Sequence, residues 1–483
     1  MISLSRRLAA ELRPVFRRLG GTTRGSGPAV CISTGPDGTH VSTRICDVAA
    51  EYHVPGNLPE ERLWAPLLLL SDCEGKQDEP VQLECGHDGS VIASRNEGGV
   101  LQRVQYDQIS PAARPDLPVR PPELTENPPE LLAALHESMI TTSPDSIRYA
   151  IGCVQFRGRS GTLAATDGMQ MLLIRGFRFP WTDNVLVPAT KVFGHRGLPQ
   201  DQSVHVGRTD DAVAIAVGPW TFWLSIPKDG KYPDLDRQIP KIADAVTRCR
   251  FTTADAEFLV TTLPKLPCEE AFHSPVTLDL NSAVVVRAGP PLPDAPADAK
   301  PTEVVLSQSV PSGEAMRINT NRRYLARALS LGLREVLLYA PERPVMCRDK
   351  RRTYLWAVLG PDGAIAPTED TVRIVSADAA TAVAKPKPTR RTKALSEPAD
   401  NTNGHAAANG SAKSNGRARR KTGQTDQHEV ASLIEQAESL RASLRDTLLK
   451  TNELIKALKR HRQESRIVRN TLASLRQIKS LEV

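Results

Sequence analysis

One pattern occurs three times along the chain: a stretch with apolar residues at helical spacing, rich in leucine in the first and third copies, is followed by three short runs of alternating apolar and polar residues. Alternation with period two predicts β-strands, and the Asp-Gly, Asp-Asp and Pro-Glu-Arg turns between runs predict hairpins. The three helix-like stretches are 63–70, 187–194 and 321–332, and the runs after them begin near Val81, Ser203 and Arg334. Repeats of this length exceed solenoid units, so we expect three similar α+β domains in tandem.

Length and composition limit the class of protein. The chain has 483 residues, and its 40% hydrophobic content is enough for a core in each of three domains. Its eight cysteines include no C-x-x-C pair, so the sequence predicts neither a zinc knuckle nor a disulfide scaffold. The longest apolar run, WAPLLLL at Trp64, is far shorter than the ~18 residues that span a bilayer, and the N-terminus lacks the apolar core of a signal peptide. We expect a cytoplasmic protein without a membrane partner.

The net charge of +7 is distributed unevenly. Residues 381–483 carry an excess of lysine and arginine, whereas residues 1–380 carry slightly more acid than base. Within this acidic body, arginines gather on predicted helices near 6–18 and 321–332. Basic helices on an acidic body are typical of a protein that meets a polyanion with one face. The alternative is that these arginines belong to ordinary solvated helix faces.

Two C-terminal segments lie outside the repeated pattern. Residues 381–427 are rich in Pro, Ala, Asn, Gly, Ser and basic residues without apolar periodicity, which predicts disorder. This segment would act either as a tether that holds phosphates loosely or as a plain linker. From Leu433 onward, a three-four apolar spacing without Pro or Gly predicts a long helix. Its narrow apolar seam favours a coiled coil with a second copy or another protein, and a single helix docked on the body is the alternative.

The most specific motifs lie between Arg148 and Lys241. LAATDG from Leu163, VPATKVF from Val187 and IPKDGKYPDLDRQIP from Ile226 follow one another there. In this order they resemble the middle domain of the bacterial DNA polymerase III beta subunit, the sliding clamp. INTNRRYLARAL and TYLWAV, farther along, resemble the last domain of that family. The resemblance covers residues 1–368 and is weakest in the first repeat.

The resemblance implies an α+β fold of three clamp-type domains, with inner helices facing a central hole and antiparallel sheets outside. Two such chains close head to tail around duplex DNA. We expect clamp domains at 1–118, 119–243 and 244–368, a disordered basic linker at 369–427 and a coiled-coil helix at 428–483. Basic helices that face phosphates across water attract DNA without reading its sequence, which permits sliding. The candidates for DNA contact are Arg13, Arg17, Arg18, Arg24, Arg148, Tyr149, Arg322, Arg323 and Arg327.

The family also binds short apolar motifs of polymerases, clamp loaders and repair proteins in a pocket between its second and third domains. Carried over by position, this pocket would contain Ile151, Thr166, Gly168, Met169, Gln170, Met171, Pro233, Arg237, Gln238, Leu355 and Ala357. Met169-Gln170-Met171 stands where the family commonly has His-Arg-Leu, and VLGPDG replaces its closing Met-Pro-x-Arg segment. Methionines suit adaptable binding surfaces and core strands equally well. The sequence therefore leaves open whether the pocket binds an altered motif or has decayed.

Two kinds of function remain open at this point. A sliding clamp-like processivity factor would encircle DNA as a homodimer and tether replication or repair proteins. A clamp-fold paralogue would instead be a non-encircling, DNA-associated scaffold that acts through its basic linker and coiled coil. The sequence contains no catalytic, metal-ligand or cofactor motif, and histidines such as His40 and His53 have no partner at motif spacing. We therefore expect no enzymatic activity, no cofactor and a nucleoid-associated location.

Overall fold

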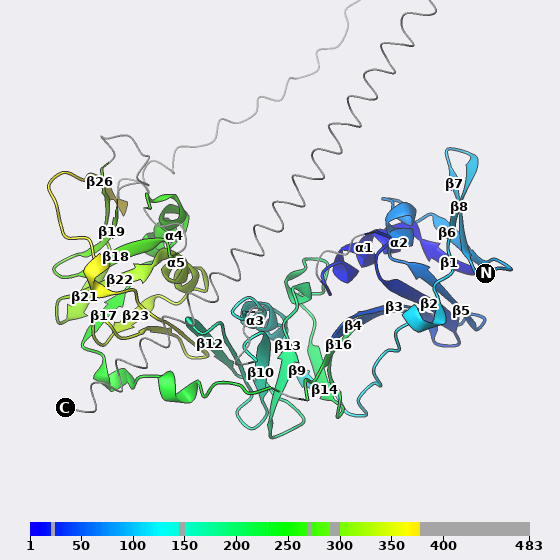
Figure 1. Ribbon diagram of the computed structural model, residues 1–483, viewed down its shortest axis with the longest axis horizontal. Helices are drawn as coiled ribbons and strands as arrows, with labels where there is room; N and C mark the ends of the chain where they lie inside the picture. Colours follow the sequence, from blue (N-terminus) through cyan, green and yellow to red (C-terminus); the bar gives the residue numbers. More distant parts are fainter. Residues whose placement is uncertain (21–24, 144–149, 229, 269–272, 290–299, 377–483) are drawn as a thin grey trace, which may run out of the picture. The chain divides into compact units, whose positions relative to one another are not determined.

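The computed structural model describes residues 1–20, 25–143, 150–228, 230–268, 273–289 and 300–376. These residues form an α+β protein of four sheets and few helices (Figure 1). Three successive sets of elements, here called the first, second and third modules, repeat the same plan. The predicted coiled-coil helix and the predicted linker from residue 377 onward lie outside the described residues.

The first module runs from β1 to β8. Its elements are β1 (Ile2–Ser5), α1 (Arg6–Phe16), β2 (Ala29–Gly35), β3 (Gly38–Ile45), β4 (Val48–Pro55), β5 (Glu61–Pro66), α2 (Leu68–Cys73), β6 (Pro80–Cys85), β7 (Val91–Glu97) and β8 (Val100–Tyr106). Helix α1 begins where the Ser5 hydroxyl accepts a hydrogen bond from the Leu8 N–H at 3.1 Å. The predicted helix at 63–70 is wrong in its first half. Leu63 and Ala65 alternate into the core as part of β5, and α2 begins only after Pro66.

The second module runs from β9 to β16. Its elements are β9 (Thr125–Asn127), α3 (Glu130–Met139), β10 (Cys153–Arg157), β11 (Thr162–Thr166), β12 (Gln170–Arg175), β13 (Asn184–Pro188), the 3₁₀ turn η2 (Val192–Gly194), β14 (Val204–Arg208), β15 (Ala212–Val217) and β16 (Trp220–Ser225). The predicted helix at 187–194 is wrong, because Val187 pairs with Val154 inside a sheet and only η2 is helical. The one-turn 3₁₀ helices η3 (Asp236–Gln238) and η4 (Ile242–Asp244) follow.

The third module runs from β17 to β25. Its elements are β17 (Thr247–Arg250), α4 (Thr253–Thr262), η5 (Leu263–Lys265), β18 (Pro275–Leu280), β19 (Val284–Ala288), β20 (Thr302–Leu306), β21 (Val310–Gly313), β22 (Met316–Asn321), α5 (Arg322–Ser330), β23 (Glu335–Leu338), β24 (Val345–Arg348) and β25 (Arg352–Trp356). The predicted helix at 321–332 is confirmed. Helix α5 follows the Asn321 cap and ends at Ser330, and Gly332, two residues later, has a φ of 77° that suits glycine after a helix end.

Two of the four sheets continue from one module into the next. The strand orders are β1-β6-β7-β8, β5-β2-β3-β4-β16-β15-β14-β9, β13-β10-β11-β12-β25-β24-β23-β17-β21 and β22-β18-β19-β20-β26. The three predicted strand triplets are confirmed as β6–β8, β14–β16 and β23–β25. Antiparallel pairs join the modules: β4 pairs with β16 (Figure 1), and β12 pairs with β25.

The joint between β12 and β25 has a separate apolar cluster on each face. Side chains alternate along β12, so Leu172 and Ile174 belong to the main core, which also includes buried residues of α3. Met171 and Leu173 point to the other face, where they pack in a cluster with Leu235. This alternation places a pocket beside the joint, as described below.

The segment after β25 contains one more strand, β26 (Val372–Val375). The sequence predicts disorder from residue 369, and for these four residues the prediction is wrong. Val372 and Ile374 lie on β26, which pairs in parallel with β20, so the edge of an existing sheet supplies partners that composition alone does not reveal. None of the helices in the described ranges is long and apolar enough to cross a membrane.

Candidate functional site

A pocket of about 570 Å³ lies beside the joint of β12 and β25. It brings together ten of the eleven predicted pocket residues: Thr166, Gly168, Met169, Gln170, Met171, Pro233, Arg237, Gln238, Leu355 and Ala357. Ile151 is buried instead and does not line it. Six lining residues were missed by the sequence prediction, namely Lys231, Tyr232, Asp234, Leu235, Pro344 and Trp356. Five of these lie within two positions of a predicted residue in the sequence, whereas Pro344 comes from the turn before β24.

Hydrogen bonds shape the rim of this pocket. The Asp167 carboxylate accepts from the N–H groups of Met169 and Gln170, both at 2.8 Å. Gly168, which lies between Asp167 and Met169, has a φ of 92°, which suits glycine at the tip of a tight turn. The Ala357 N–H donates to the Met169 carbonyl at 2.8 Å and extends the β12–β25 pairing to the rim. These hydrogen bonds hold the backbone of the rim in place.

The pocket has an apolar floor and a polar border. Met171 and Leu355 on the floor are almost fully buried, whereas Met169 at the rim is 45% exposed. Arg237 on the border is exposed and pairs with Asp234 at 2.9 Å. The two methionines thus have different roles, one in the core strand and one at the surface. Such a floor accepts apolar side chains, and Met169 is free to adapt to them.

Arg327 lies between α5 and α3 and not on an open surface. Its side chain is 16% exposed and donates hydrogen bonds to Thr141 Oγ1 at 2.7 Å and to the Glu137 carbonyl at 2.9 Å. It also lies over the Tyr354 ring at 5.7 Å. Gln170 completes the link, because its Oε1 accepts from Arg327 at 3.3 Å and from the Tyr354 hydroxyl at 2.5 Å. Arg327 therefore joins two modules and has little surface left for DNA.

Arg322 is buried, which corrects its assignment as a DNA contact. Only 4% of the residue is exposed. Its guanidinium donates to five backbone carbonyl oxygens, those of Ser274 at 3.0 Å, Leu263 at 3.3 Å, Pro267 at 2.6 Å, Pro275 at 3.2 Å and Leu266. Burial lowers its pKa from the usual value for arginine. The basic pattern of α5 reflects, at this position, a structural anchor for the chain after α4.

Other predicted DNA contacts are exposed. Arg17 and Arg18 lie at the end of α1, and Arg323 lies on α5. Arg13 is partly exposed and pairs with Glu74 at 2.7 Å. The remaining candidates, Arg24, Arg148 and Tyr149, lie outside the described residues.

Two further basic residues flank the segment that Arg18 contacts. Arg18 donates to the Gly194 carbonyl at 3.4 Å, and the Thr190 hydroxyl donates to the Arg18 carbonyl at 3.3 Å. Lys191 and Arg196 lie next to these residues in the sequence and are exposed. The pKa of His195 is lowered mainly by burial and, to a smaller extent, by the positive charge of Arg18. We call Arg17, Arg18, Lys191 and Arg196 the α1–η2 basic cluster. No pattern in the sequence predicts that the two segments meet.

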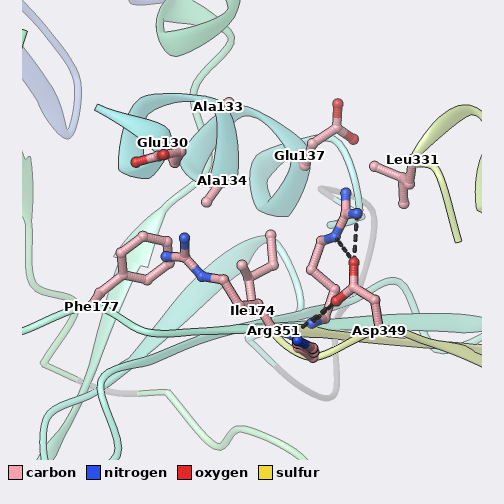
Figure 2. Close-up of a pocket in the computed structure, with 11 residues that line it drawn as sticks. Glu130, Ala133, Ala134, Glu137, Ile174, Phe177, Leu331, Asp349 and Arg351 are labelled. Carbon is pink, nitrogen blue, oxygen red and sulfur yellow. Dashed lines mark hydrogen bonds and ion pairs between the residues drawn. The ribbon is translucent and has the colours of Figure 1, made fainter. Parts of the chain in front are cut away.

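A second pocket, of about 490 Å³, lies between α3 and the turn before β25 (Figure 2). Ala134 and Ile174 are among its apolar lining residues. At its border the Arg351 guanidinium lies 5.3 Å from the centre of the Phe177 ring, and Asp349 pairs with Arg352 at 2.6 Å. Arg351 also donates hydrogen bonds to the carbonyl groups of Arg175 and Gly176.

Among the described residues, one group of side chains has the chemistry to hold a metal ion. Asp37, His40 and His53 each offer a ligand atom, and these atoms lie within 4.8 Å of one another. The two histidines are 13 positions apart and meet only because β3 and β4 pair with His40 opposite His53. Motif spacing could not reveal this group, because strand register creates it.

The fold matches solved structures of bacterial sliding clamps. The DNA polymerase III subunit beta from Pseudomonas aeruginosa superposes with a TM-score of 0.61 at 16% identity, covering 74% of this chain and 99% of that chain. The sliding clamp from Bacillus subtilis gives 0.61 at 17% identity, covering 74% and 98%. A putative beta subunit from Eubacterium rectale gives 0.60 at 13% identity, covering 74% and 99%.

Near-complete coverage of those chains at such low identity shows a shared fold. No protein-family model and no curated protein matches the sequence. The likeness confirms, at the level of the fold, the resemblance that the motifs of the second and third modules predicted. This chain has the fold of the bacterial DNA polymerase III beta subunit, the sliding clamp.

Proposed function

We propose that this protein is a sliding clamp-like processivity factor. Two copies would close head to tail around duplex DNA and carry replication or repair proteins along it. The observation that carries the proposal is the pocket beside β12 and β25, which unites ten residues predicted from a peptide-binding family on a scaffold with the clamp fold. Its partners would be polymerases, clamp loaders or repair proteins with short apolar motifs. The role requires no catalysis and no cofactor, and it places the protein at the nucleoid in the cytoplasm.

DNA contact is assigned to exposed basic side chains. The α1–η2 basic cluster and Arg323 remain from the helices that the sequence singled out, together with the partly exposed Arg13. Arg24, Arg148 and Tyr149 stay predictions. Arg322 and Arg327 leave the set because their guanidinium groups are used inside the protein. Long, exposed basic side chains attract phosphates without base contacts, which is what sliding requires.

The scaffold alternative is favoured by one observation. Strand β26 covers the edge of β20, and a covered edge is unavailable to a second copy. In that case the chain would bind DNA without encircling it, and the predicted basic linker and coiled coil would provide its other contacts.

Retention on circular DNA distinguishes the two functions. The full chain is bound to a closed plasmid and washed at high salt, and the plasmid is then cut once. An encircling protein stays on the closed circle and is released by linearisation, because topology and not affinity holds it. Equal loss from both forms would contradict encirclement and support the scaffold.

Charge reversal tests the DNA-facing cluster. The double substitution Arg17→Glu and Arg18→Glu should reduce the slope of log K for DNA binding against log salt concentration. The expected reduction corresponds to the loss of about two phosphate contacts. Arg248→Glu with Arg250→Glu is the matched control, because both side chains are exposed on β17. An unchanged salt slope in the α1 variant, measured by fluorescence anisotropy on duplex DNA, would refute this assignment.

A further inference from the structure

The strands that join the modules obey one rule. The run β2-β3-β4 ends in β4, which pairs with β16, the last strand of β14-β15-β16 in the next module. The run β10-β11-β12 ends in β12, which pairs with β25, the last strand of β23-β24-β25. Both joints are antiparallel pairs between equivalent edges. The rule leaves two unjoined edges of the same kinds, at β20 and at β8.

The β8 edge has the features of an interface. It is the last strand of the sheet β1-β6-β7-β8 and pairs only with β7 among the described residues. Its Val100 and Leu101 side chains are 64% and 59% exposed. A long edge strand with exposed apolar side chains is a ready template for another strand. By the joining rule, its matching partner is the β20 edge of a second copy.

The β20 edge is already occupied. Strand β26 pairs with it in parallel, with Val304 opposite Ile374, and the Val372 N–H donates to the Pro301 carbonyl at 2.8 Å. Ile374 packs against the main core. Just after β26, the buried Ser376 hydroxyl donates to Asp255 at 2.5 Å. The strand is therefore held along its length and anchored at its end.

Asp255 makes this anchor specific. The residue is fully buried, and its carboxylate also accepts from the Ser309 hydroxyl at 2.6 Å and from the Gln308 N–H at 3.1 Å. Both partners lie directly after β20. Ser376 thus docks into a polar site formed by Asp255 of α4 and the segment that follows β20. Such hydrogen bonds are expected of a strand that binds at one specific position on the sheet.

We propose that β26 is a built-in cap on the β20 edge, and that its release allows β20 to pair antiparallel with β8 of a second copy of this chain. The inference rests on the proposed function for its biological meaning, since this pairing would close the ring. A four-residue parallel pair competes here with the seven-residue strand β8. Antiparallel pairing is slightly more stable per residue, so a released edge favours the second copy.

A proline substitution in the full chain tests the cap. Ile374→Pro removes an N–H and an apolar contact from β26, and the dissociation constant of the homodimer, measured by sedimentation velocity without DNA, should fall at least about tenfold. Glu369→Pro, in the exposed segment before β26, is the control and should leave it unchanged. Adding Leu101→Asp to the Ile374→Pro variant should restore the weaker association of the native chain.

A milder variant tests the same proposal in case Ile374→Pro disrupts folding. Arg373 is exposed and lies 3.8 Å from Glu303 of β20, so Arg373→Glu loosens β26 by repulsion and should shift association in the same direction. Unchanged association in both β26 variants, or a dimer that survives Leu101→Asp, would overturn the cap. Dimers that form yet slide off closed circles would refute only the proposed function. A native chain that is already dimeric and retained on circles would refute only the cap.

A second inference concerns Asp37, His40 and His53. The His40 ring lies between two carboxylates, with Nε2 at 2.9 Å from Asp37 and Nδ1 at 3.4 Å from Glu51. Two arrangements suit this contact: Nε2–H donates to Asp37, or, with Nδ1–H pointing to Glu51, the Nε2 lone pair and the Asp37 oxygen share a cation. The His53 ring stacks on His40 at 4.4 Å, and its Nε2 donates to the Asp37 carbonyl at 2.8 Å.

We infer that these three side chains form a zinc(II) site. The ligands would be Asp37 Oδ2, His40 Nε2 and a ring nitrogen of His53, with water in the fourth position. Glu51 would orient His40 through its other nitrogen, as carboxylates commonly do for metal-bound histidines, and Arg120 in turn binds Glu51. Among the charged residues that line the hollow containing His40, the acids Asp37, Glu60 and Glu61 outnumber Arg62, although Glu61 also pairs with the N-terminal ammonium group.

Titration with metal salts tests this site. The full chain should bind one Zn²⁺ in calorimetry, and Co²⁺ should give the visible absorption of a tetrahedral complex. His53→Ala should weaken Zn²⁺ binding at least about tenfold, because it removes one of three ligands. His87→Ala is the control, since that exposed histidine lies outside the group. Absent Co²⁺ bands, or equal Zn²⁺ affinity in both variants, would overturn the assignment.

Discussion

Replacing Arg322 with alanine is expected to lower the free energy of unfolding by about 3 kcal/mol, because several buried carbonyl groups lose their donor at once. The guanidinium supplies hydrogen bonds to five carbonyl oxygens around the chain that follows α4. A buried acceptor without a donor retains the cost of leaving water. Urea-induced unfolding followed by circular dichroism measures the loss.

The neighbouring arginine provides a matched control. Arg323 is exposed on the same helix, and Arg323→Ala should change the free energy of unfolding by no more than about 0.5 kcal/mol. If the two alanine variants are equally stable, the carbonyl network around Arg322 contributes nothing. A variant of Arg322 that keeps its stability and loses only DNA affinity would restore this residue to the DNA-facing set.

The strands and the pocket were predictable for different reasons. The strand triplets β6–β8, β14–β16 and β23–β25 follow from two-residue alternation, which reports burial on one face directly. The pocket residues came from ordered motifs that resemble those of a known family, so ten positions converge although they lie on separate strands, turns and a 3₁₀ helix. The helix predicted at 187–194 failed because its apolar residues serve a strand and a 3₁₀ turn.

The arginines of α5 show which features of a side chain's environment the sequence does not predict. Arg322, Arg323 and Arg327 share one helix and look alike in sequence, yet one binds buried carbonyls, one is exposed and one joins two modules. These differences arise from what packs against each side chain. The same holds for β26 and for the pair His40 and His53, since strand pairing over long sequence distances creates both. The local spacing of residues therefore does not predict which strands pair.

The pocket itself yields the second large expected effect. The full chain is used to select binders from a random eight-residue peptide library, and the selected peptides should carry adjacent apolar side chains. Leu355→Asp should weaken their binding about a hundredfold, because it places a carboxylate on the apolar floor that receives them. Fluorescence anisotropy with labelled peptides measures the change.

The control places the same charge on another apolar residue. Ile242 in η4 is exposed and lies outside the pocket lining, so Ile242→Asp should leave the peptides bound. Because Leu355 pairs with Met171 at the joint of two modules, thermal unfolding of both variants separates a blocked pocket from a loosened joint. Peptides that bind the folded Leu355→Asp variant as tightly as the native chain would show that this pocket is not where partners dock, and the tethering role would then have to rest on another surface.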